Sequence, residues 1–145
     1  MADLTNINWI YPPNFTGTYE AGTKNGHRRH IVLCTCISDG TGEDDAIKLK
    51  RTDMLTSDGE VPSKLVIERI DYQINGMIVK IGYNNVDDVL VAALYSGDGC
   101  IDFTKVGGFT PQDDVDNEGG DIVFTTENCS DGDTYTITLQ VRLKQ

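Results

Sequence analysis

Apolar and polar residues alternate without a break along residues 134–144, near the end of the sequence. The apolar positions all have the same parity: Tyr135, Ile137, Leu139, Val141 and Leu143. A period of two gives a strand one buried face and one solvated face, as in an antiparallel sheet. We therefore predict a long strand with one wet face over this segment.

Similar patterns, separated by turn residues, recur through the rest of the chain. They predict strands at 30–37, 47–51, 65–74, 77–83, 87–95, 101–103 and 121–126. Residues 87–95 are apolar on both parities and also fit a short helix, but their length favours a strand. About eight strands with turns between them predict an all-β fold, an antiparallel two-sheet sandwich that is jelly-roll-like.

Two irregularities are predicted within this pattern. The Asn-Gly pair at 75–76 favours a type I′ turn, so we expect a two-residue hairpin in which Ile74 pairs with Met77. The buried parity changes at 68–69, where we expect a β-bulge in preference to a strand buried on both faces.

The length of 145 residues suits a single sandwich domain over 1–145. Within it, residues 1–20 form either an N-terminal arm or an edge strand, because Pro12-Pro13 interrupts regular structure. This segment carries Trp9, Tyr11 and Phe15. Aromatic side chains of this kind anchor protein interfaces, although these three could equally cover the domain's own core.

The chain carries 12 basic and 23 acidic residues, a net charge of −11. Residues 82–141 contain a single basic residue, Lys105, and therefore predict an acidic surface. This charge excludes binding to nucleic acid or to an anionic membrane as the main activity. The sequence has neither a secretion signal nor an apolar run of about 20 residues, so we expect a soluble protein made inside the cell.

The densest positive charge lies at Lys24, Arg28 and Arg29, close to the aromatic N-terminal segment. Two interpretations stay open for these residues: a solvated face, or a patch that docks on an acidic strip of a neighbouring subunit. Basic residues also alternate with apolar ones over 47–51, which predicts a strand with a basic outer face.

No residue pattern predicts a metal site. Cys34 and Cys36 point the same way in a strand and lack a second pair at metal spacing, so we predict buried free thiols rather than a zinc site. Residues 114–118 space oxygens like the first half of a calcium loop, but Thr125 stands where such a loop ends in a glutamate. We interpret this segment as a solvated loop.

Catalytic residues and a cofactor site are not predicted either. His27 and His30 flank two arginines in a polar stretch, and no serine or cysteine stands in the strained turn of a nucleophile. The Gly107-Gly108 pair is a turn, because no helix follows it to make a phosphate site. We therefore expect no enzymatic activity.

A family resemblance rests on the Gly107-Gly108 turn, the strand 121–126 after Gly119-Gly120, and the strand that follows 131–133 with its basic C-terminus. These segments resemble small all-β virion proteins of tailed bacteriophages. The resemblance implies a capsid decoration or cement protein, or a head-to-tail component, without catalytic residues. It would be made in the host cytoplasm, lie on the capsid surface, and bind the major capsid protein or other virion subunits as a homo-oligomer such as a trimer.

Two other functions are compatible with the residues. One is a carbohydrate- or receptor-binding module that uses Trp9, Tyr83 or Tyr95 to stack on sugar rings. The other is a glycan-cleaving enzyme, since an acidic surface supplies pairs of carboxylates. An exposed aromatic platform would favour the sugar-binding module, and an arm extending from the body would favour the assembly protein.

Overall fold

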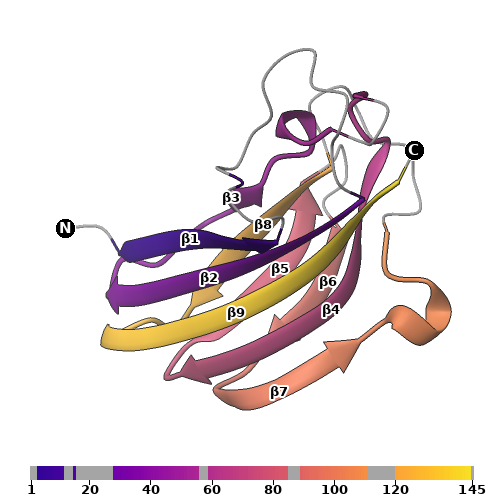
Figure 1. Ribbon diagram of the computed structural model, residues 1–145. Helices are drawn as coiled ribbons and strands as arrows, with labels where there is room; N and C mark the ends of the chain where they lie inside the picture. Colours follow the sequence, from indigo (N-terminus) through magenta and orange to yellow (C-terminus); the bar gives the residue numbers. More distant parts are fainter. Residues whose placement is uncertain are drawn as a thin grey trace.

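The fold comprises two antiparallel β-sheets packed face to face (Figure 1). The computed structural model describes residues 3–11, 15, 28–55, 59–84, 89–110 and 120–144. Within these residues the strands are β1 (Leu4–Tyr11), β2 (Arg29–Asp39), β3 (Ala46–Leu49), β4 (Lys64–Asn75), β5 (Ile78–Asn84), β6 (Val89–Leu94), β7 (Gly97–Asp102), β8 (Asp121–Glu127) and β9 (Asp131–Lys144). Two short 3-10 turns, η1 (Arg51–Asp53) and η2 (Thr104–Val106), lie in the connections.

One sheet has five strands in the order β1-β2-β9-β4-β7, and the other has four in the order β3-β8-β5-β6. The chain from β2 to β9 pairs like one long hairpin, because β2 lies beside β9, β3 beside β8, β4 beside β7, and β5 beside β6. These pairs alternate between the two sheets, which makes the long hairpin a jelly roll. The predicted fold class is therefore confirmed, with β1 added as an edge strand.

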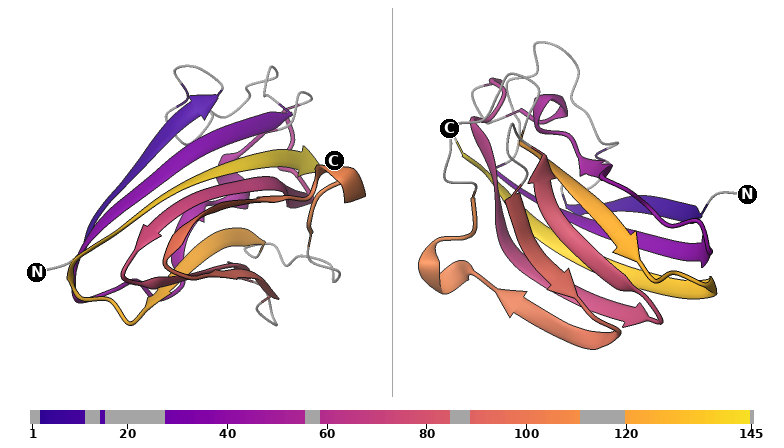
Figure 2. Two further views of the ribbon diagram at one scale, coloured as in Figure 1. Left: turned by 90° about the horizontal axis from the view of Figure 1, so that it is seen from below. Right: turned by 180° about the vertical axis from the view of Figure 1, so that it is seen from behind.

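Figure 2 shows the two sheets as facing layers. The buried apolar residues of both sheets form one cluster, the core. In β9 the predicted alternation is confirmed, since every apolar residue from Tyr135 to Leu143 is buried. The buried ring of Tyr83 places its hydroxyl 2.7 Å from the carbonyl oxygen of Leu65 and 2.9 Å from that of Phe109. Among the described residues, no helix has the length and apolar character needed to cross a bilayer.

The predicted hairpin at 75–76 is wrong. β4 pairs with β7 and β9 in the five-stranded sheet, whereas β5 pairs with β6 and β8 in the four-stranded sheet. The turn therefore carries the chain from one sheet to the other. Ile74 and Met77 both reach the core, but they do so from different sheets.

The predicted bulge is confirmed, because the register between β4 and β9 shifts between Ile67 and Arg69 and leaves Glu68 as the extra residue. The prediction of a basic outer face over 47–51 is wrong. A second register shift, between Ile47 and Leu49 in β3, turns Lys48 inward, and Arg51 is buried as well. Ile47 lies on the outer face instead.

Candidate functional site

Two shallow depressions meet on the outer face of the five-stranded sheet, the face turned away from the core. Their volumes are about 600 and 720 Å³, and Thr134 and Thr136 of β9 line both. One depression extends over β4 to the start of β7, and the other extends over β2 to β1. We call them together the trough, whose outward-facing residues are Leu4, Asn6, Thr35, Ile37, Gln73, Asn75, Ser96, Asp98, Thr134 and Thr136.

The sheet register aligns one polar residue from each strand across the trough. Asn6 lies opposite Thr35, Thr35 opposite Thr136, Thr136 opposite Gln73, and Gln73 opposite Asp98. Because neighbouring strands are about 4.8 Å apart, this transverse row is about 19 Å long. It presents amide, hydroxyl and carboxylate groups side by side, which together both donate and accept hydrogen bonds.

The row faces solvent because of the alternation within its strands. In β9 the buried neighbours Tyr135 and Ile137 point into the core, so Thr136 must point outward. Within the described part of the chain, no hydrogen bond engages the side chains of Asn6, Thr35, Gln73 or Thr136. These groups are therefore available to a ligand.

Exposed apolar residues lie at one end of the trough, and an exposed aromatic residue is next in sequence to the lining at the other. At the β1 end, Leu4 and Ile37 lie opposite each other and are 70% and 54% exposed. At the β7 end, the side chain of Tyr95 is 68% exposed and directly precedes Ser96 in the lining. The hydroxyl of Ser96 holds the adjacent turn, since it accepts a bond from the Gly76 N–H at 3.1 Å and lies 3.3 Å from the carbonyl oxygen of Ile74.

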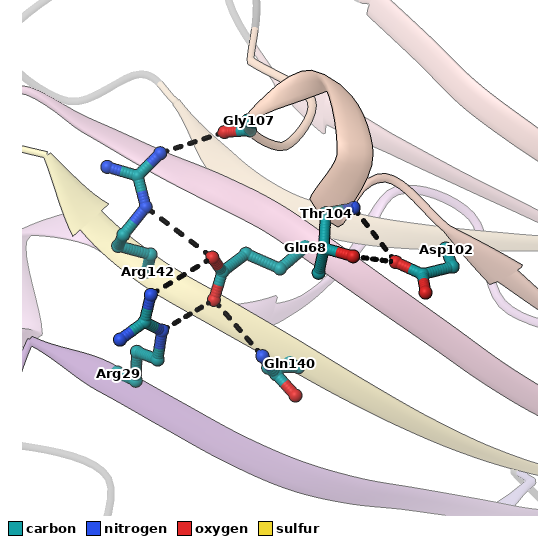
Figure 3. A network of polar contacts seen from close by, with 7 residues as sticks. All are labelled: Arg29, Glu68, Asp102, Thr104, Gly107, Gln140 and Arg142. Atoms are coloured by element: carbon teal, nitrogen blue, oxygen red, sulfur yellow. Dashed lines mark hydrogen bonds and ion pairs between the residues drawn. The ribbon is translucent and has the colours of Figure 1, made fainter.

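A buried carboxylate marks the same outer face beyond the trough (Figure 3). Glu68, the extra residue of the bulge, accepts hydrogen bonds from Arg29 Nε at 2.9 Å and from Gln140 Nε2 at 3.2 Å. Arg142 Nε lies 3.6 Å from its other oxygen, and the same guanidinium donates to the carbonyl of Gly107 at 2.9 Å. The carboxylate therefore joins β2, β9 and β4, and Arg142 extends the network to the loop after η2.

Opposing effects set the pKa of Glu68. Burial raises it, but the hydrogen bonds from Arg29 and Gln140 and the two arginine charges outweigh burial, so the pKa is lowered overall. In return, the hydrogen bond and charge of Glu68 raise the pKa of Arg29. The network therefore holds Glu68 ionised and serves as a clamp between strands.

A second polar cluster lies inside the sandwich, at the edge formed by β3. The ammonium group of Lys48 contacts one oxygen of Glu43, and the hydroxyl of Tyr135 donates to the other. Burial, together with this accepting carboxylate, raises the pKa of Tyr135. Each buried charge in the cluster has a partner, which is the condition for a stable buried ion pair.

The cysteines do not form a reactive site. Cys34 and Cys36 are buried free thiols as predicted, and burial raises the pKa of each to about 12. The described residues contain no group of three or more histidine, cysteine or acidic side chains placed to hold a metal ion. The predicted solvated loop at 114–118 lies outside the described residues.

The predicted interface residues are only partly brought together. Trp9 and Phe15 pack edge to face with ring centroids 4.6 Å apart, and both contact the ring of His30, which is buried. Tyr11 is exposed at the end of β1. The first 20 residues thus include a paired edge strand, and Trp9 and Phe15 pack beside the core.

The predicted basic patch of Lys24, Arg28 and Arg29 does not act as one group. The side chain of Arg29 is engaged with Glu68, while Arg28 is exposed and its carbonyl accepts a bond from the Leu143 N–H at 2.7 Å. Lys24 lies outside the described residues. Docking of these residues on a neighbouring subunit stays a prediction.

Two of the three proposed sugar-stacking residues are not exposed platforms. Tyr83 is fully buried, and Trp9 is packed against Phe15 and His30. Tyr95 is exposed and precedes Ser96, a residue of the trough lining, in the sequence. Sequence reasoning did not find the trough itself, although the outward threonines of β9 were visible as the polar half of its alternation.

No protein-family model matches the chain, and no curated protein matches it. Solved structures similar to it include a mutant of a family 29 carbohydrate-binding module, with 13% identity and a TM-score of 0.40, covering 96% of this chain and 92% of that one. A second family 29 module has 12% identity and a TM-score of 0.38, covering 96% and 88%. Similarity at this level assigns neither a family nor a ligand to this chain.

Proposed function

We propose that this domain is a non-catalytic binding module that holds a carbohydrate chain in the trough. The observation that carries the proposal is the transverse row Asn6, Thr35, Thr136, Gln73 and Asp98, one polar residue from each of the five strands. Sugar hydroxyls both donate and accept hydrogen bonds, so they can replace the water on such a row. A rigid sheet holds these groups in place before the ligand arrives, which lowers the entropic cost of binding.

The ends of the trough suit an extended ligand. The exposed ring of Tyr95 can stack on a sugar face, and Leu4 with Ile37 can pack against the apolar C–H groups of another. The trough is open and shallow, unlike the enclosed pockets that bury a small ligand. Asp98 lies in the row and the chain has a net charge of −11, so the proposed ligand is a neutral or cationic glycan rather than an acidic one.

Calorimetric titration against neutral, cationic and acidic polysaccharides tests this proposal. We expect the double variant Thr136→Val with Gln73→Leu to weaken binding at least tenfold, which is about 1.4 kcal/mol, because it removes two hydrogen-bonding groups and keeps the shape of the strands. Thr138→Val is the matched control, since Thr138 lies on the same strand and the same face but outside the lining. Equal affinity of both variants, or no binding by the wild type to any of these glycans, would refute the proposal.

A second candidate is an assembly role as a capsid decoration or cement subunit of a tailed-phage virion. It is favoured by an apolar row on the other side of the molecule, across the outer face of the four-stranded sheet. Ile47 lies opposite Val123, Val123 opposite Gly82, and Gly82 opposite Leu90. Ile47 and Leu90 are exposed at 50% and 58%, whereas Val123 between them is buried. Exposed apolar residues at the two ends of such a row suit packing against another subunit.

A further inference from the structure

The outer edge of β1 is uncharged and, among the described residues, unpaired. β1 pairs with β2 on one side, and no described residue pairs with its other side. Its eight residues contain no charge and no proline. Natural proteins usually protect edge strands with lysine, proline or short length, because free peptide groups at an edge recruit another strand. β1 has neither lysine nor proline and is not short, and its register shift against β2 comes after Trp9, so residues 4–9 form a regular edge.

The sequence of β1 is partly symmetric about Ile7. Around Ile7, the strand reads Asn on both sides, then Thr5 and Trp9, then the exposed aliphatic residues Leu4 and Ile10. In a two-fold interface each residue contact occurs twice. The near-symmetric sequence of β1 therefore places like residues, such as the two asparagines, opposite each other when the strand pairs with a second copy.

We propose that two copies of this chain form a dimer by antiparallel pairing of β1 with β1, centred on Ile7. In this register Leu4 lies opposite the partner's Ile10, and Asn6 lies opposite the partner's Asn8. Thr5 lies opposite the partner's Trp9 on the inner side. The pairs between Thr5 and Trp9 join residues of the same parity, so the amide pair lies on the outer face and both strands keep their buried sides. Ile10 is the extra residue of the register shift against β2.

Charge supports a second copy of this chain as the partner. Asp3 and Asp39 lie at the Leu4 end of the edge, and the exposed Arg28 lies at its Tyr11 end, where β2 begins, while the neighbouring Arg29 is already paired with Glu68. Antiparallel pairing places the acidic end of each copy beside the basic end of the other. The interface thus avoids the self-repulsion that the net charge of −11 imposes elsewhere.

The dimer has a consequence for the outer face. A two-fold axis perpendicular to the sheet keeps both troughs on the same side. The transverse rows of the two copies then meet at the ends formed by Asn6. The five-stranded sheets become one ten-stranded sheet with a doubled trough. This inference does not depend on glycan binding, but a dimer would bind a long glycan with two linked sites and so with higher avidity.

Sedimentation and light scattering of the full chain, without any glycan, test the dimer. We expect the wild type to dimerise at protein concentrations up to about 100 μM. Asn6→Lys with Asn8→Lys should give a monomer, because each lysine then faces another across the interface. That variant also lowers the net negative charge, which by itself would favour association, so loss of the dimer identifies the edge.

Charge exchange provides the matched control. Asn6→Asp with Asn8→Asp should also be monomeric alone, whereas an equal mixture with the lysine variant should form a mixed dimer. Circular dichroism checks that both variants are folded. A wild type that stays monomeric at these concentrations, or a lysine variant that still dimerises, would overturn the proposal.

Cross-linking tests the register. The experiment uses a Cys100→Ser background, which removes the exposed native thiol. In this background Ile7→Cys should form a disulfide-linked dimer, because Ile7 lies opposite the partner's Ile7. Paired strands place opposite Cα atoms about 4.5 to 5.5 Å apart, within the range of a disulfide. Thr5→Cys should not cross-link, since its opposite residue is the partner's Trp9. The reverse result would mean a different register.

Discussion

Gly76 and Gly132 allow backbone strain and steric contact to be measured separately. Their φ angles are nearly the same, +88° and +91°, in a region that other residues resist. A Cβ on Gly76 would lie 2.3 Å from Oδ1 of Asp133, whereas a Cβ on Gly132 would have nothing within 4 Å. The carboxylate of Asp133 is held in turn by the N–H of Ser130 at 2.8 Å.

We expect Gly132→Ala to lower the free energy of unfolding by roughly 1 to 2 kcal/mol, the cost of the left-handed conformation. Gly76→Ala should cost more, because the side chain of Asp133 must also move and strain its bond to Ser130. Denaturant titration of both variants measures the difference. Equal losses would show that Asp133 moves without cost.

At the scale of the element, the bulge in β4 gives the outer face its clamp. The extra residue, Glu68, is placed where Arg29 of β2 and Arg142 of β9 both reach it. A regular strand would offer no additional side chain at this point. The bulge therefore ties three strands of the five-stranded sheet together.

The lowered pKa of Glu68 predicts a pH dependence of stability. The ionised form is favoured by the fold, so its contribution is complete above the carboxyl's unfolded value of about 4.3 and is lost as pH falls through the lower folded pKa. We expect Glu68→Gln to be less stable than the wild type at pH 7, and the difference to shrink below about pH 4. Thermal unfolding across pH measures this.

Glu127→Gln is the control for this experiment. Glu127 pairs with Lys80 at 2.6 Å, but both side chains are exposed, and such surface pairs contribute little. Its loss should change stability far less than the loss of Glu68. A difference at pH 7 that persists unchanged in acid would mean that Glu68 acts through packing rather than charge.

At the scale of the whole molecule, the two proposed functions use opposite faces. The trough lies on the five-stranded sheet, and the apolar row of Ile47, Val123 and Leu90 lies on the four-stranded sheet. A variant of one face therefore leaves the other intact. The exposed Arg28 can also be substituted without disturbing the Glu68 network, whereas Arg29 is part of that network.

The assembly role predicts that Leu90→Asn and Arg28→Glu each weaken reattachment to virus particles stripped of this protein. The first removes apolar contact, and the second reverses a rim charge, so only the second effect should fade as salt shortens the Debye length toward about 8 Å. Thr136→Val, on the other face, is the control. Full occupancy by both variants would argue against attachment through these surfaces.

The sequence by itself determined which side of most strands is buried. In β9, the strict alternation from Tyr135 to Leu143 predicted the buried face, and the parity change at Glu68 predicted the bulge. These features are local: burial of apolar side chains on a pleated strand requires a period of two whatever the neighbouring strand is. The fold class followed from the same patterns.

Only the tertiary structure decided which strands are neighbours. Asn75-Gly76 is compatible with a hairpin, yet β4 and β5 lie in different sheets, where β4 pairs with β9 and β5 with β8, both from distant segments. The transverse row likewise joins Asn6, Thr136 and Asp98 through the registers of strands far apart in sequence. An alternating pattern fits many partners equally well, so the choice among them depends on packing of the whole core, and with it the position of the trough.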